Sequence, residues 1–168
     1  SIGLTNIWDE HKGDSSVKVA VIDDSFDLNH IELKGQCEKA WNVFEYSDHV
    51  YSDGYKMHHG THVAGTVLAK SNNGFGISGV APNCKLIPIQ ISDASGIITT
   101  SSLLDGIFYA LKNGADVINL SIALFDKISQ SLNCLFSSLQ SFVFIALLSL
   151  LCHLFNNNDS WLIISQII

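Results

Sequence analysis

Two side chains of this sequence, Asp23 and His59, have the types and the setting that proton-transfer chemistry requires. Asp23 directly follows the β-rich run 17–22, so we expect it at the carboxyl edge of a buried parallel strand. His59 lies 36 positions later and opens a segment whose apolar spacing predicts a helix. A carboxylate can hold the tautomer of an imidazole while the imidazole takes a proton from a nucleophile. By residue type alone, Asp23 would more often be a turn or cap residue and His59 an ordinary core or surface histidine.

Four sequence segments around these two residues follow one another in a characteristic order. They read Val-Ala-Val-Ile-Asp at 19–23, His-Gly-Thr-His-Val-Ala-Gly-Thr at 59–66, Gly-Val-Ala-Pro at 79–82 and Gly-Ala-Asp-Val-Ile-Asn-Leu-Ser at 114–121. Together they resemble the subtilisin-like serine proteases, and the resemblance extends over roughly residues 4–123. The histidine segment is the most specific of the four. The resemblance implies peptide-bond hydrolysis through an acyl-enzyme, by a triad whose chain order is Asp, His and Ser.

The resemblance assigns roles to particular residues of this chain. It implies that Asp23 is the triad aspartate and that His59 is the acid–base catalyst, whereas Asp24 stands where the family usually has Thr or Ser. It also implies a cleft in which an extended peptide or protein substrate is held as an added β-strand. The residues that are expected to form the two walls of this cleft are Ser95 and Gly96 on one side and Leu120, Ser121 and Ile122 on the other.

The sequence lacks the segment that carries the catalytic serine in that family. Neither Gly-Thr-Ser-x-Ala-x-Pro nor the Ala-Ala-Gly-Asn-like segment of the oxyanion hole is present, and no Gly or Pro follows Gly114. Removal of the serine lowers turnover in this family about a millionfold. We therefore expect a truncated serine endopeptidase that is inactive as written. The alternative is a non-catalytic remnant that binds an extended peptide or a partner protein.

Strand and helix patterns alternate along the first three quarters of the chain. Residue types predict strands at 17–22, 41–44, 84–91 and 117–120, and helices that begin at His59 and cover 99–113. For the second helix, Ser101 is the predicted N-cap and Gly114 the predicted C′ residue. This alternation predicts an α/β fold with a mainly parallel sheet. By resemblance, the fold is part of a subtilisin-like three-layer fold in which helices flank the sheet.

Charge divides the chain into two parts and limits its partners. The 168 residues include nine Lys, no Arg and sixteen acidic residues. The formal net charge of −7 argues against binding to nucleic acid phosphates. All charged residues except Asp159 precede Ile128. We therefore predict that residues 1–123 are the N-terminal part of a peptidase domain and that residues 124–168 are an apolar, divergent tail.

The tail contains a segment, 135–155, whose length and apolar content would just span a bilayer. Polar residues interrupt this segment and Lys127 is the nearest basic residue, which weakens its interpretation as a membrane anchor. The composition of the tail favours a truncated chain or a gene that is read in another frame. The membrane anchor is the second interpretation, and a genuine replacement layer of the fold is the third. A membrane is an expected partner only if the segment is a real anchor. The family resemblance implies a secreted or extracellular protein.

A glycine-containing loop after the histidine segment raises the question of a metal ion. Residues 74–79 read Gly-Phe-Gly-Ile-Ser-Gly, which suits an ordinary turn. By resemblance, this loop could instead hold a structural calcium ion through Asn73 and an acidic residue such as Glu32. We expect the ordinary loop, and the implied reaction requires no cofactor. His58 and His62 share a helix face, but the glutamate of a His-Glu-x-x-His metal site is absent.

Overall fold

The computed structural model describes residues 4–51, 58–121 and 162–165 of the chain. The chain divides into two compact units, Ser1–Ile122 with Leu162–Ile168, and Ala123–Trp161. All described residues belong to the first unit. The predicted domain boundary at residue 123 and the predicted anchor at 135–155 therefore lie outside the described residues and stay predictions.

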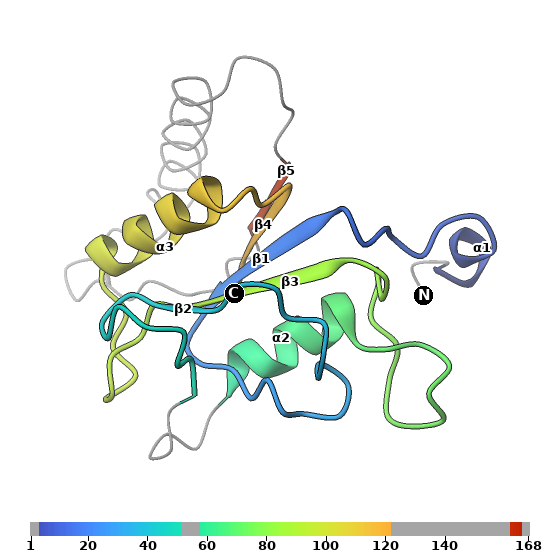
Figure 1. Ribbon diagram of the computed structural model, residues 1–168, viewed down its shortest axis with the longest axis horizontal. Coiled ribbons are helices and arrows are strands. Elements are labelled where there is room, and N and C mark those ends of the chain that lie inside the picture. Colours follow the sequence, from blue (N-terminus) through green and yellow to red (C-terminus); the bar gives the residue numbers. More distant parts are fainter. Residues whose placement is uncertain (1–3, 52–57, 122–161, 166–168) are drawn as a thin grey trace, which may run out of the picture. The chain divides into compact units, whose positions relative to one another are not determined.

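Helices and strands alternate along the first unit (Figure 1). The strands form a five-stranded sheet in the order β2-β3-β1-β4-β5, and each neighbouring pair is parallel. The predicted α/β fold with a mainly parallel sheet is thereby confirmed. The last strand lies in the segment for which the sequence predicts a divergent tail. In chain order the elements are α1 (Leu4–Trp8), β1 (Lys18–Asp23), β2 (Trp41–Asn42), α2 (His59–Leu68), β3 (Lys85–Gln90), α3 (Thr100–Lys112), β4 (Val117–Leu120) and β5 (Leu162–Ser165).

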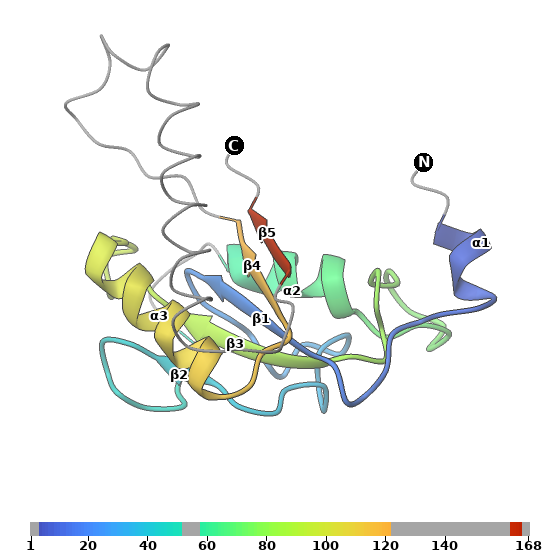
Figure 2. The same cartoon turned by 90° about the horizontal axis from the view of Figure 1, so that it is seen from above.

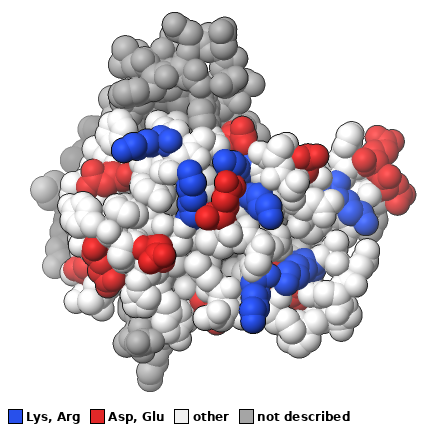
Figure 3. Space-filling model, in the orientation of Figure 1, with Lys and Arg blue, Asp and Glu red and all other residues white. Residues whose placement is uncertain are grey.

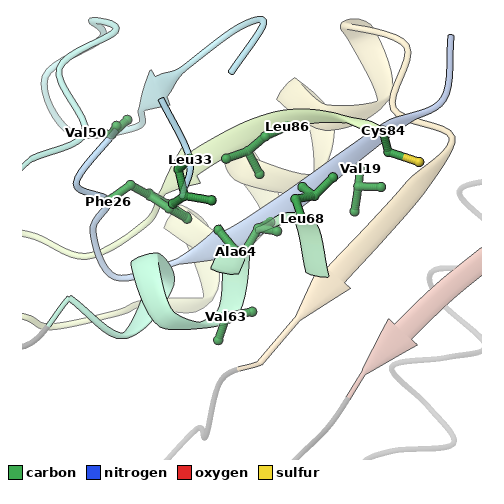
Figure 4. Packing of buried hydrophobic residues seen from close by; sticks show 10 residues of the cluster. Val19, Phe26, Leu33, Val50, Val63, Ala64, Leu68, Cys84 and Leu86 are labelled. Carbon is green, nitrogen blue, oxygen red and sulfur yellow. The ribbon is translucent and has the colours of Figure 1, made fainter. Parts of the chain in front are cut away.

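Helices α2 and α3 cover opposite faces of the sheet, as Figures 1 and 2 show. Successive side chains of a strand point to opposite faces, so one strand can serve both layers. On one face, Val19 and Val21 of β1 belong to a buried cluster that includes Leu68 of α2 (Figure 4). On the other face, the fully buried Ile22 approaches Gly106 of α3. The central strand β1 is therefore buried between two helices, as the three-layer prediction requires.

The N-cap of α3 is Thr99, so the prediction that Ser101 is the cap is wrong. Oγ1 of Thr99 accepts a hydrogen bond from the Ser102 N–H (3.1 Å), and Oγ of Ser102 accepts one from the Thr99 N–H (3.0 Å). This reciprocal capping box satisfies two backbone donors at the start of the helix. Gly114 follows the helix with a φ of 74°, which confirms it as the C′ residue.

The second strand, β2, is shorter than predicted and ends at Asn42 rather than at Phe44. Asn42 itself turns the chain, because its Oδ1 accepts a hydrogen bond from the Phe44 N–H (3.0 Å). Its backbone N–H donates to the carbonyl of Ser47 (2.8 Å), which closes the turn. An Asn side chain that binds nearby backbone groups competes with strand pairing in this way.

The surface of the described residues shows no single dominant charge on the face drawn in Figure 3, where Lys and acidic side chains are interspersed. That face therefore offers no continuous basic area of the kind that binds phosphates. Within the described ranges, the helices are all too short or too polar to cross a bilayer.

Candidate active site

The structure brings Asp23 and His59 together as a hydrogen-bonded pair. Nδ1 of His59 lies 2.8 Å from Oδ1 and 3.0 Å from Oδ2 of Asp23. The Asp23 side chain is 2% exposed, whereas 44% of the His59 side chain is exposed. The carboxylate is thus held inside the protein while the imidazole reaches the solvent.

The sheet topology explains why these two residues meet. Asp23 is the last residue of β1, which lies between β3 and β4. His59 is the first residue of α2, and α2 packs on β1 and β3. The carboxyl ends of parallel strands meet at one edge of the sheet, and a crossover helix that leads into a parallel strand begins at that edge. The end of the central strand and the start of the helix are therefore adjacent.

The surroundings of the pair shift the pKa of both groups upward. Burial raises the pKa of Asp23 to about 6, although the hydrogen bonds from His59 and from the Asp24 N–H act to lower it. Partial burial lowers the pKa of His59, but the hydrogen bond with Asp23 and the negative charges of Asp23 and Asp24 outweigh this effect and raise it above its ordinary value. The folded protein therefore holds protons on this pair more firmly than the unfolded chain does.

The orientation of the imidazole leaves one nitrogen available for chemistry. Asp23 engages Nδ1 of His59, so Nε2 is the atom that can accept or donate a proton. Above the pKa of His59, the proton sits on Nδ1 and Nε2 can act as a base toward a hydroxyl group. After the transfer, the carboxylate stabilises the imidazolium. The pair can therefore perform general acid–base catalysis.

One predicted wall of the cleft, Ser95 and Gly96, lies in a tight loop after β3. The Gly96 N–H donates to the carbonyl of Asp93 (3.0 Å), and the φ of Gly96 is 78°. Oδ1 of Asp93 accepts a hydrogen bond from the Ser95 N–H (2.8 Å). The loop is thus held by the backbone and the side chain of Asp93 at the carboxyl side of β3, the strand next to β1.

The other predicted wall follows β4, on the opposite side of β1. Leu120 is the last residue of β4, and its register partner in β1 is Ile22. The hydroxyl of Ser121 donates to Oδ1 of Asn119 (2.9 Å). Ile122 lies outside the described residues. The strands that lead into the two predicted walls therefore flank the strand that carries Asp23, while the binding of a peptide between them stays a prediction.

The predicted calcium ligands Asn73 and Glu32 contact each other. Glu32 is buried, its Oε2 accepts a hydrogen bond from Nδ2 of Asn73 (2.8 Å) and its Oε1 accepts one from the Ile77 N–H (3.2 Å). Oδ1 of Asn73 accepts a hydrogen bond from the Phe75 N–H (3.2 Å). Calcium requires six to eight oxygen ligands, whereas N–H groups face this carboxylate. In this arrangement both carboxylate oxygens of Glu32 are already engaged by N–H donors.

His58 and His62 are the histidines nearest to His59 in the sequence. Nδ1 of His58 lies 3.0 Å from Oγ of Ser25, and its ring stacks on Tyr51 with 4.8 Å between the centroids. Among the residues that the structure describes, no group of three His, Cys, Asp or Glu side chains could hold a metal ion. The contacts of His58 are those of a structural residue.

Asp24 is a residue of this site whose contacts the sequence analysis does not predict. The sequence marks it only as a departure from Thr or Ser. In the structure, Asp24 is buried, its Oδ1 accepts a hydrogen bond from the Gly60 N–H (2.8 Å) and its Oδ2 accepts one from the His59 N–H (3.2 Å). One signal in the sequence could have indicated this role. The residue before α2 is His58, whereas helix starts are usually capped by Ser, Thr, Asp or Asn, so another side chain was needed as the cap.

Comparison with known proteins yields matches to proteases over most of the chain. The model of the subtilase family matches residues 14–146. A thermophilic serine proteinase of Bacillus sp. (strain AK1) is 41% identical over 115 residues, which are 68% of this chain and 28% of that protein. The minor extracellular protease Vpr of Bacillus subtilis (strain 168) is 34% identical over 130 residues, which cover 72% of this chain and 16% of that protein.

Solved structures give the same result. Fervidolysin from Fervidobacterium pennivorans, a keratinolytic enzyme related to subtilisin, matches with a TM-score of 0.59 and 34% sequence identity. The match covers 68% of this chain and 18% of that one. This chain therefore spans less than a third of the length of each of these relatives.

Proposed function

Because this chain belongs to the subtilase family, we propose that Asp23 and His59 are the orienting carboxylate and the acid–base catalyst of a serine-type endopeptidase site. The observation that carries the proposal is the contact of Nδ1 of His59 with both oxygens of the buried Asp23. A serine hydroxyl would give its proton to Nε2 while its oxygen attacks the peptide carbonyl. The imidazolium would then return the proton to the leaving amine.

The proposed substrate is an extended peptide or a protein segment. It would lie between the loop that carries Ser95 and Gly96 and the end of β4 at Leu120 and Ser121. Strands on both sides of β1 lead into these segments, so a peptide between them would pass the exposed imidazole of His59. Backbone hydrogen bonds would provide affinity in such a complex, and side-chain pockets would provide preference. By analogy with an extracellular relative, we also propose that the protein acts outside the cell.

We further propose that the 168 residues do not hydrolyse peptides by themselves. The sequence contains neither the Gly-Thr-Ser segment nor the Ala-Ala-Gly-Asn-like segment that supply the nucleophile and an oxyanion donor in this family. Ser121, which directly follows the strand β4 beside β1, donates its hydroxyl proton to Oδ1 of Asn119. The second candidate function, binding of a peptide or protein without cleavage, uses the same cleft and differs only in that no nucleophile is supplied.

A fluorophosphonate probe, which reacts with activated serines, separates these functions. We expect no covalent labelling of the full chain because no serine of the sequence stands in the Gly-Thr-Ser segment that provides the nucleophile in this family.

In ¹⁵N NMR spectra recorded above the pKa of His59, we expect the imidazole proton on Nδ1, since Asp23 accepts a hydrogen bond from that nitrogen. Together these results would show an acid–base pair with the correct tautomer and without an activated serine.

His59→Ala is the control for the probe experiment. Labelling of the parent chain that disappears in His59→Ala would show that a serine of this chain is activated. That result would contradict the proposed inactivity while supporting the catalytic role of His59. A proton on Nε2 instead of Nδ1 would contradict the role itself, because Nε2 could then accept no proton.

We propose that the loop around Asn73 needs no metal ion and that the site needs no cofactor. The N–H groups of Asn73 and Ile77 already satisfy the Glu32 carboxylate. We therefore expect the same midpoint of thermal unfolding with millimolar calcium and with EDTA. A rise of the midpoint with calcium that is lost in Glu32→Gln would show that the carboxylate binds the ion, contrary to this proposal.

A further inference from the structure

We propose that Asp24 is a positioning residue of the His59–Asp23 pair: its carboxylate binds the first turn of α2 and thereby sets where the helix presents the imidazole. The inference rests on the proposed function of the pair. It concerns a position at which the family that the sequence resembles usually has Thr or Ser, whereas this chain has Asp.

The start of α2 has no cap of its own. His58 is the N-cap residue, but its side chain makes no capping hydrogen bond and lies instead against Oγ of Ser25. The first N–H groups of a helix have no carbonyl four residues earlier to which they can donate. The Asp24 carboxylate accepts hydrogen bonds from two of them, His59 (3.2 Å) and Gly60 (2.8 Å). A negative charge is also favourable at this positive end of the helix dipole.

Asp24 is held in place by groups other than the helix. Its backbone N–H donates to Oδ1 of Asp23 (2.8 Å), and its carbonyl accepts a hydrogen bond from the hydroxyl of Ser92 (2.7 Å). Its Oδ1 also accepts one from the Ser25 N–H (2.5 Å), and the residue is only 7% exposed. Asp24 therefore binds the carboxylate of the pair with its backbone and the backbone of His59 with its side chain. It fixes both partners relative to each other.

The charge of Asp24 distinguishes it from an uncharged cap. The charged groups that raise the pKa of His59 are Asp23 and Asp24, and within the described residues no charged side chain of β3, α3 or β4 contributes. The titratable neighbours of His59 on its own helix are His58 and His62. Asp24 also acts to raise the pKa of Asp23. A serine or threonine cap would hold the helix without these effects on basicity.

The test compares Asp24→Asn and Asp24→Ala in the full chain, with the pKa of His59 followed by NMR and the midpoint of thermal unfolding measured alongside. Asparagine keeps one acceptor oxygen but loses the charge, whereas alanine loses both. We expect a lower pKa of His59 in both variants. We expect the midpoint to fall by about 4 °C in Asp24→Ala and by less in Asp24→Asn.

Asp27→Asn is the matched control, because it removes the same charge three residues further along, where Oδ1 accepts a hydrogen bond from the Asn29 N–H (3.0 Å) and not from the start of α2. This control should change neither quantity. An unchanged pKa of His59 in Asp24→Asn, with or without a lower midpoint, would reduce Asp24 to an ordinary helix cap and overturn the proposal. If Asp24→Ala does not fold, Asp24→Asn alone decides. The titration needs neither nucleophile nor substrate, so its outcome is independent of the probe experiment.

Discussion

Replacement of Gly60 by alanine is expected to lower the free energy of unfolding by about 3 kcal/mol and to separate His59 from Asp23. A Cβ atom at this position would lie 2.6 Å from the carbonyl oxygen of Ser25 and 2.9 Å from ring atoms of Phe26. Both neighbours are fully buried and cannot give way without disturbing the core. The start of α2 must therefore move outward, and His59 moves with it. Urea unfolding and the NMR signals of the imidazole measure the two effects.

Gly65→Ala in the same helix is the control for this prediction. Apart from its chain neighbours and the backbone of its own helix, no atom of the described residues lies within 4 Å of a Cβ built at Gly65. Alanine there should raise the free energy of unfolding by about 0.5–1 kcal/mol, because glycine loses more backbone freedom on entering a helix. Equal losses in the two variants would mean that the helix tolerates no added methyl group anywhere, and the specific contact with Ser25 and Phe26 would not be the cause.

Asp23→Asn is expected to stabilise the protein near neutral pH while it disables the acid–base pair. Burial raises the pKa of Asp23 from 3.8 to about 6. Because the folded value lies above the unfolded value, the ionised carboxylate destabilises the fold, and this destabilisation develops as the pH rises from about 4 through about 6. The shift of about two units corresponds to about 3 kcal/mol. An asparagine at this position has no charge to bury.

The measurement is the difference in the free energy of unfolding between variant and parent, determined by urea titration at several pH values. This difference should increase by up to about 3 kcal/mol between pH values of about 4 and about 7. His59 acts in the same direction, because its raised pKa stabilises the parent below about 6.5 and this contribution is lost as the pH rises through the folded value. The exposed Asp105→Asn serves as the control and should show no such trend. A constant difference for Asp23→Asn would contradict the raised pKa.

The long strands and both major helices could be predicted because their signals are local. The pattern at 17–22 corresponds to β1 at Lys18–Asp23, and the pattern at 84–91 corresponds to β3 at Lys85–Gln90. Runs of β-branched and other apolar residues favour a buried parallel strand whatever surrounds them. The alternation of strands and helices then restricts the topology to a parallel sheet with right-handed crossovers.

The errors occur where neighbouring residues offer competing local structures. Thr99, Ser101 and Ser102 all carry hydroxyl groups, and only the reciprocal geometry of Thr99 with Ser102 decides between them. Asn42 ends β2 early because its side chain binds the following backbone. The strand β5 is a short apolar run, Leu-Ile-Ile-Ser, inside the segment that the sequence assigns to a divergent tail, and its place in the sheet depends on pairing with β4. Pairing with a distant strand leaves no trace in a local window of sequence.

The α/β class, the parallel sheet, and the carboxylate and imidazole that meet at its edge follow from the order of the amino acids. The burial of Asp23 with its raised pKa, the capping of α2 by Asp24, and the N–H donors around Glu32 emerge only in the folded protein. The physical reason is the range of the forces involved. Secondary structure can be predicted from the periodicity of residues that are neighbours in sequence. The burial of a side chain and its hydrogen-bond partners depend on distant segments that folding brings together.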